Sequence, residues 1–116
     1  MGMKQKIMIV DDAEINRQIL MAILGDKYEY VQAENGCQAV HMLQHDLTID
    51  LILLDINMPE MNGFQMLERM NKFHWIDEIP VIMISSEEKR DIIEQAYIFG
   101  AEDYIRRPFD AFIVRR

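Results

Sequence analysis

The sequence is short, acidic and rich in apolar residues. Its 116 residues include 12 Lys+Arg against 20 Asp+Glu, which gives a net charge of −8, and 50% of the residues are hydrophobic. This composition excludes a disordered chain and predicts a single domain over residues 1–116. The negative charge argues against direct nucleic-acid binding, because neutralising phosphates requires clustered Lys and Arg.

The sequence also predicts where the protein resides. Its longest apolar run, residues 19–24, is far shorter than the roughly 20 residues that cross a bilayer, so we expect no membrane contact. Cys37 is the only cysteine, which agrees with a reducing compartment and a cytoplasmic protein. We expect residues 1–2 to be vector-derived, because Met-Gly precedes a second Met, and the C-terminus to be cut from a longer chain.

Five apolar runs have the character of strands. They occupy residues 7–10, 28–33, 51–54, 81–84 and 104–105. Three of them are continuous rather than alternating, as in strands that are buried on both faces of a parallel sheet.

Helical patterns lie between these runs. The first places Ile15, Ile19, Ala22 and Ile23 on its apolar face, and the second places Ala39, Met42 and Leu43 there. A third helix is expected over residues 64–70, a fourth over residues 87–99 with Ile92, Ile93, Ala96 and Tyr97 as its apolar side, and a short or truncated fifth helix after Pro108. The alternation predicts an α/β fold of the flavodoxin-like type, a doubly wound five-stranded parallel sheet of order 2-1-3-4-5 with helices on both faces.

Three carboxylates are expected to meet at one edge of this sheet. Asp11 and Asp12 follow the first strand, and Asp55 follows the third. In the expected topology these strands are neighbours, and functional groups gather where their carboxyl ends meet. Acidic groups this close repel one another, which favours protonation or capture of a cation. Mg²⁺ fits best because it prefers oxygen ligands, here Asp12, Asp55 and a backbone carbonyl near Asn57.

The ends of the fourth and fifth strands supply groups suited to a phosphoryl group. Ser85 offers a hydroxyl donor and Arg107 a fixed positive charge. Asp55 is then placed as a nucleophile toward phosphorus, with Mg²⁺ and Arg107 offsetting the charge on the transferring oxygens. The expected product is an aspartyl phosphate, so the protein would catalyse its own phosphorylation and dephosphorylation without a separate turnover substrate.

Four segments of the chain resemble the receiver domains of two-component response regulators. They are residues 9–12, 53–63, 80–86 and 100–109, in the order and at the spacing typical of that family. The resemblance covers essentially the whole chain and implies a phosphorylation-activated signalling switch. The phosphoryl group would come from the phosphohistidine of a sensor histidine kinase or a phosphotransfer protein. The resemblance leaves open an output domain in the full-length chain and a homodimer through the fourth helix, fifth strand and fifth helix.

The same resemblance implies roles for individual residues. Asp55 corresponds to the phosphoacceptor, Asp11 and Asp12 to the acidic pair that holds Mg²⁺, Ser85 to the switch hydroxyl and Tyr104 to the aromatic switch. In the family, the hydroxyl moves toward the phosphoryl group and the aromatic ring turns inward behind it, which alters a binding surface.

Three further positions bear on how closely the chain follows the family. Arg107 stands where the family carries Lys before the proline, and the two are not equivalent because a guanidinium is longer, planar and more weakly hydrated. Asn57 and Glu87, two residues after Asp55 and Ser85, occupy positions that in the family tune dephosphorylation by controlling the approach of water.

Two rival functions stay open. A pseudo-receiver, which acts as a non-phosphorylated interaction module, is supported by Arg107 alone, and the retention of all three aspartates argues against it. An aspartate-nucleophile phosphatase of the haloacid-dehalogenase-like type carries a second aspartate two residues after the nucleophile, and here that position is Asn57. Turnover of phosphate esters would support the phosphatase, and failure to form any acyl phosphate would support the pseudo-receiver.

Overall fold

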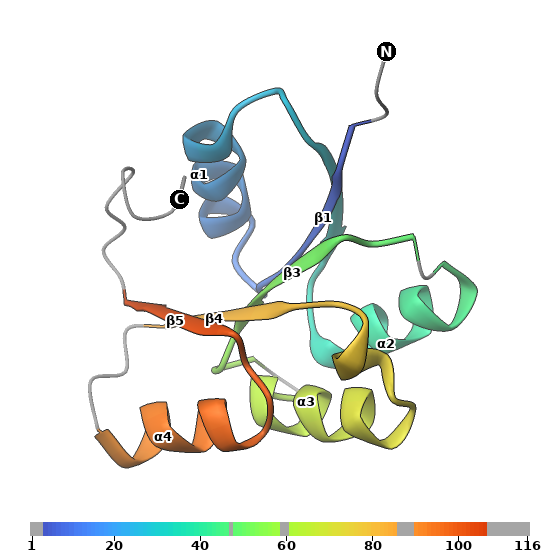
Figure 1. Ribbon diagram of the computed structural model, residues 1–116. Helices are drawn as coiled ribbons and strands as arrows, with labels where there is room; N and C mark the ends of the chain where they lie inside the picture. Colours follow the sequence, from blue (N-terminus) through green and yellow to red (C-terminus); the bar gives the residue numbers. More distant parts are fainter. Residues whose placement is uncertain (1–3, 47, 59–60, 86–89, 107–116) are drawn as a thin grey trace.

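The sheet predicted from the apolar runs is present. The computed structural model describes residues 4–46, 48–58, 61–85 and 90–106, which contain one parallel five-stranded sheet in the order β2-β1-β3-β4-β5 (Figure 1). The strands are β1 (Lys6–Val10), β2 (Glu29–Ala33), β3 (Leu51–Asp55), β4 (Val81–Ser85) and β5 (Asp103–Arg106). Each strand overlaps the run that predicted it, so the fold class and the strand order are confirmed.

Helices cover both faces of the sheet, as predicted. They are α1 (Glu14–Leu24), α2 (Gly36–His45), α3 (Gly63–Lys72) and α4 (Arg90–Ile98). In Figure 1, α1 lies on one side of the sheet, whereas α2, α3 and α4 lie on the other. A short 3₁₀ turn over Trp75–Asp77 has no counterpart in the apolar pattern, and the helix expected after Pro108 lies outside the described residues. None of the helices in the described part of the chain is long and apolar enough to cross a membrane.

Two layers of buried side chains hold the sheet between its helices. Successive residues of a strand point to opposite faces, so Met8 and Val10 join the layer under α2 and α3, whereas Ile7 and Ile9 join the layer under α1. The continuous apolar runs therefore reflect burial on both faces of the sheet. Each fully buried Ile, Leu or Met side chain stabilises the fold by about 1.5–3 kcal/mol.

The prediction of which face of α1 packs on the sheet is wrong. Ile15 and Ile19 are 66% and 40% exposed, whereas Arg17 and Leu20 are buried. A second apolar stripe packs on the sheet instead, formed by Leu20, Met21 and Leu24. Because α1 carries apolar residues on two sides, periodicity alone cannot choose between them. The contact of Arg17 with the carbonyl of Asp11 at the end of β1 favours the observed orientation.

The predicted apolar side of α4 is confirmed in part. Ala96 is buried and Ile92 packs against the core, but Tyr97 is exposed. Phe99, just beyond the helix, takes the inward position, with its ring 5.9 Å from that of Phe64 on α3. The hydroxyl of Tyr97 lies 3.4 Å from Asp103 Oδ1, and partial desolvation together with this carboxylate raises the pKa of the phenol.

Asp46 ends α2 and links it to β1. Its carboxylate accepts hydrogen bonds from the hydroxyl of Thr48 and, at 2.9 Å, from the Thr48 backbone N–H, and Lys6 Nζ lies 3.2 Å away. The Thr48 hydroxyl has the largest influence among these contacts, which lower the pKa of Asp46 from 3.8 to about 2. Because the unfolded chain binds this proton more readily, the contacts stabilise the fold above pH 3.8 and lose that effect as the pH falls through about 2.

Asp46→Asn is therefore expected to lower the free energy of unfolding at neutral pH. The loss should shrink as the pH falls from 3.8 to about 2, because the wild-type carboxylate is then protonated as well. Urea unfolding of both proteins across this range measures the difference. Glu102→Gln, at another exposed carboxylate, is the control. A loss of the same size at every pH would contradict a role for the charge of Asp46.

Candidate metal centre

The ends of β1 and β3 bring three carboxylates together. β1 and β3 are adjacent parallel strands with Val10 paired to Leu54, so the next residues, Asp11 and Asp55, lie at the same edge of the sheet. One carboxylate oxygen from each of Asp11, Asp12 and Asp55 lies within 4.8 Å of the other two. We call these three residues the acidic trio.

The acidic trio is buried on one side and open to solvent on the other. Asp11 and Asp55 are 2% and 5% exposed, whereas Asp12 is exposed. Asp11 is held in place by its neighbours, because its Oδ1 accepts hydrogen bonds from the Ala13 N–H at 2.9 Å and from Asn16 Nδ2 at 3.4 Å. A cation that arrives from solvent therefore meets the carboxylate of Asp12 first.

The donor atoms of the acidic trio suit a hard divalent cation. All three are carboxylate oxygens, and no His or Cys of the described residues belongs to the group. Mg²⁺ takes one or two carboxylates and completes its shell with water and phosphate oxygens, whereas structural zinc sites use His and Cys. Mg²⁺ therefore fits the residues present. Asn57 is exposed two residues after Asp55, and its carbonyl as a further ligand stays a prediction.

Ser85 and Tyr104 lie on the strands that continue the sheet beyond the trio. Asp55 pairs with Ile84 of β4, so Ser85, the next residue, lies at the same edge, and its side chain is fully buried. Tyr104 pairs with Met83, two residues back along β4, and packs half-buried against the core under α4. Met83 and Ser85 are two residues apart on β4, so their side chains point to the same face of the sheet. Tyr104, the partner of Met83, therefore lies behind Ser85 on that face.

Two residues singled out from the sequence fall outside the described part of the chain. They are Arg107 and Glu87. Their expected roles, as the cation beside the phosphoryl group and as a residue that tunes dephosphorylation, stay predictions.

The first residue of α3, Gly63, lies very close to Asp55. The Gly63 N–H donates to the carbonyl of Ile56 at 2.9 Å, and a Cβ on Gly63 would lie 2.6 Å from the carbonyl oxygen of Asp55. Asn62 then starts α3 with a capping box, because its side chain accepts from the Gln65 N–H and the Gln65 side chain accepts from the Asn62 N–H, both at 2.9 Å. Only glycine permits this close return of the chain.

The apolar pattern missed one charged residue beside the trio. Arg17 of α1 is buried and donates to the backbone carbonyl of Asp11 and to Gln32 on β2. The signal in the sequence is weak, because a single Arg in a helix is more often a solvated residue. Only its burial at the end of β1 distinguishes it.

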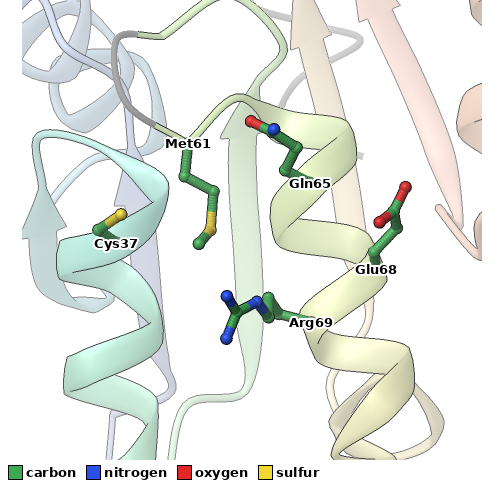
Figure 2. A pocket seen from close by; sticks show the side chains of 5 residues that line it. All are labelled: Cys37, Met61, Gln65, Glu68 and Arg69. Atoms are coloured by element: carbon green, nitrogen blue, oxygen red, sulfur yellow. The ribbon is translucent and has the colours of Figure 1, made fainter.

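A hollow on the surface between α2 and α3 is separate from the acidic trio. Its volume is about 350 Å³, and it is lined by Cys37, Met61, Gln65, Glu68 and Arg69 (Figure 2). Figure 2 shows the side chain of Arg69 reaching from α3 toward α2 and that of Met61 pointing into the space between the two helices, with Cys37 on the first turn of α2. Most of the lining side chains are exposed, and none belongs to the trio.

Known proteins resemble this chain in both sequence and structure. Residues 7–113 match the family model of the response regulator receiver domain. The two-component response regulator ORR3 of rice, Oryza sativa subsp. indica, is 33% identical over 103 residues, which cover 88% of this chain and 79% of the rice protein.

Two solved structures show the same fold. The chemotaxis protein CheY4 of Vibrio cholerae aligns with a TM-score of 0.85 at 27% identity, over 95% of this chain and 92% of that chain. A co-crystal structure of the histidine phosphotransfer protein Ypd1 of Saccharomyces cerevisiae and the receiver domain of Ssk1 aligns with a TM-score of 0.85 at 22% identity, over 96% of this chain and 83% of that chain. At that identity the second alignment concerns the fold alone.

Proposed function

Because the chain belongs to the response regulator receiver domain family, we propose that it is a phosphorylation-controlled switch in which Asp55 accepts a phosphoryl group with the help of Mg²⁺. The observation that carries this proposal is the acidic trio. The apolar strand β3 ends in a buried carboxylate, Asp55, within 4.8 Å of two others. A divalent cation between the three carboxylates would offset their mutual repulsion and would lie beside the carboxylate that reacts.

Asp55 acts as the nucleophile. One of its carboxylate oxygens attacks the phosphorus of a phosphohistidine, the new O–P bond forms as the donor's N–P bond breaks, and imidazole leaves. Asp11 and Asp12 hold Mg²⁺, which when bound offsets charge on the transferring oxygens. Ser85 donates its hydroxyl to a phosphoryl oxygen, and Arg107 supplies a second positive charge.

The phosphoryl group then changes the surface through Ser85 and Tyr104. It adds a charge of about −1.5 to −2 at Asp55 and draws the Ser85 hydroxyl toward it. The movement of Ser85 leaves space into which the Tyr104 ring turns, and this rearranges the surface of α4 and β5. Asn57 and Glu87 set how readily water reaches the acyl phosphate and therefore how long the signal lasts.

Treatment with acetyl phosphate and Mg²⁺ tests this function directly. By intact mass, the wild type is expected to gain one phosphoryl group, and Asp55→Asn, which has the same shape but no nucleophilic carboxylate, is expected to gain none. Asp26→Asn, at an exposed aspartate of the α1–β2 turn, is the control and should behave as the wild type. A chelator should prevent the gain.

Each result points to one of the three candidate functions. A mass gain also shows that Arg107 suffices in place of lysine. No mass gain in the wild type overturns the proposal and favours the pseudo-receiver, whereas release of phosphate from phosphate esters favours the phosphatase.

The exposed face of α1 is the proposed docking site for the phosphodonor protein. The solved receiver domain of Ssk1 is described in complex with a histidine phosphotransfer protein. In this chain, α1 begins two residues after Asp12 and exposes Ile15 and Ile19, one helical turn apart. Adjacent exposed apolar side chains beside the proposed phosphorylation site form a patch that a protein partner can cover.

The double variant Ile15→Ser, Ile19→Ser is expected to slow transfer from a phosphorylated histidine phosphotransfer protein about tenfold. Its phosphorylation by acetyl phosphate should be unchanged, because a small donor needs no docking surface. Ile98→Ser, at a side chain of α4 that is 79% exposed, is the matched control. If the protein donor transferred to the double variant at the wild-type rate, the donor would dock elsewhere.

A further inference from the structure

Arg17 is a buried cation behind the acidic trio. It is 7% exposed. Its Nη1 donates to the backbone carbonyl of Asp11 at 2.6 Å, and its Nε donates to Oε1 of Gln32 at 2.9 Å. Both acceptors are neutral, so the guanidinium is hydrogen-bonded by these contacts but not neutralised by them.

Among the described residues, a counter-charge for Arg17 has to come from farther away. In the described part of the chain, no carboxylate lies within ion-pair distance of its guanidinium. A buried charge without a counter-charge carries a large desolvation penalty, and arginine cannot avoid it by losing its proton. Nη1 binds the carbonyl of Asp11, and one carboxylate oxygen of that same residue lies within 4.8 Å of carboxylate oxygens of Asp12 and Asp55. This contact links Arg17 directly to a residue of the acidic trio, which makes the trio the candidate source of negative charge.

We propose that Arg17 is an internal counter-cation of the acidic trio. It stabilises the metal-free domain and lowers the affinity of the trio for a divalent cation. A positive charge behind three carboxylates offsets part of their mutual repulsion, and this stabilises the buried carboxylates when no ion is bound. The same charge repels an incoming cation across a protein interior that screens weakly. The inference rests on the proposed metal site.

A purely structural role for Arg17 leads to a different result for metal binding. If Arg17 only tied α1 to β1 and β2, its removal would loosen Asp11, and the affinity for a divalent cation would fall or stay the same. If Arg17 is the counter-cation, its removal weakens the metal-free fold but raises that affinity. The direction of the change in affinity separates the two roles.

Arg17→Met is the decisive variant, because it keeps an apolar stem and removes the charge. Mn²⁺ serves as the probe, with the free ion measured by electron paramagnetic resonance. Arg17→Met is expected to bind Mn²⁺ about tenfold more tightly than the wild type, since one repelling charge is gone. Its thermal unfolding midpoint should fall in chelator and recover toward that of the wild type at saturating Mg²⁺. Arg17→Lys keeps the charge and should keep the wild-type affinity.

Two Gln32 variants keep the inference testable where Arg17→Met does not fold without metal. Gln32→Glu places a carboxylate at the position to which Nε donates, so it neutralises Arg17 and should tighten Mn²⁺ binding. Gln32→Met removes only the hydrogen bond and should leave the affinity unchanged. Gln32 is exposed, so the fold tolerates both changes.

The possible results separate this inference from the proposed function. If Arg17→Met binds Mn²⁺ no more tightly than the wild type, the counter-cation role is overturned and the metal site is left intact. Where Arg17→Met does not fold, the same result for Gln32→Glu leads to the same conclusion. Two results together overturn the proposed function and this inference with it. The wild type would gain no phosphoryl group, and Asp11→Asn would bind Mn²⁺ with the same affinity as the wild type.

Discussion

Asp12→Asn is expected to abolish Mg²⁺-dependent phosphorylation of Asp55 without unfolding the domain. Asp12 is exposed, yet its carboxylate lies within 4.8 Å of those of Asp11 and Asp55. The variant therefore loses a proposed metal ligand at little cost to the core. Without the metal, the negative charge of the incoming phosphoryl oxygens faces the Asp55 carboxylate directly. We expect the phosphorylation rate with acetyl phosphate to fall at least about a hundredfold.

Initial rates from intact mass, measured over a series of Mg²⁺ concentrations, check this expectation. Glu14→Gln removes a neighbouring exposed carboxylate, in the first turn of α1, and should react at the wild-type rate. In chelator, Asp12→Asn should be at least as stable as the wild type, because the trio then carries one less repelling charge. A wild-type rate in Asp12→Asn would remove Asp12 from the metal site.

Gly63→Ala is expected to destabilise the domain by about 3 kcal/mol and to displace Asp55. The added Cβ would lie 2.6 Å from the carbonyl oxygen of Asp55 and 2.9 Å from the Cα of Ile56. Both are backbone atoms, so no side-chain rotation relieves the overlap. The start of α3 has to move away from the end of β3, and the Gly63 N–H then loses its bond to the Ile56 carbonyl. Phosphorylation should slow because Asp55 moves relative to Asp11.

Urea unfolding and the phosphorylation rate measure the two effects of Gly63→Ala. Gly25→Ala is the matched control, because Gly25 has φ +86° but its Cβ would meet nothing within 4 Å. Its backbone strain should cost about 1–3 kcal/mol and leave the phosphorylation rate unchanged. If Gly63→Ala reacted as fast as Gly25→Ala, the close approach of Gly63 to Asp55 would have no bearing on the site.

The sheet and the meeting of the trio could be predicted because both depend on patterns of the chain itself. Continuous apolar runs such as residues 51–54 indicate strands buried on both faces, and strict alternation with helices restricts the connections to a right-handed, doubly wound sheet. Once the strand order is known, residues that end neighbouring parallel strands have to lie at one edge. The carboxylates of Asp11 and Asp55 therefore meet, and Ser85 lies beside them.

The orientation of the helices could not be predicted in the same way. α1 has apolar residues on two sides, and the pattern favoured Ile15 and Ile19, which the structure exposes. On α4, Tyr97 also lies outward, and Phe99 packs inward in its place. A periodicity of 3.6 residues shows that a helix has an apolar stripe but does not choose between two stripes.

The sequence by itself determined the strands, their order and the three aspartates at one edge, because hydrophobic periodicity and the rules of parallel connection are properties of the chain. The tertiary structure alone decided the face that α1 buries, the position of Arg17 behind Asp11 and the close approach of Gly63 to Asp55. These features depend on contacts between segments that are distant along the chain or on hydrogen bonds to the backbone. Contacts of that kind leave no periodic signal in the sequence.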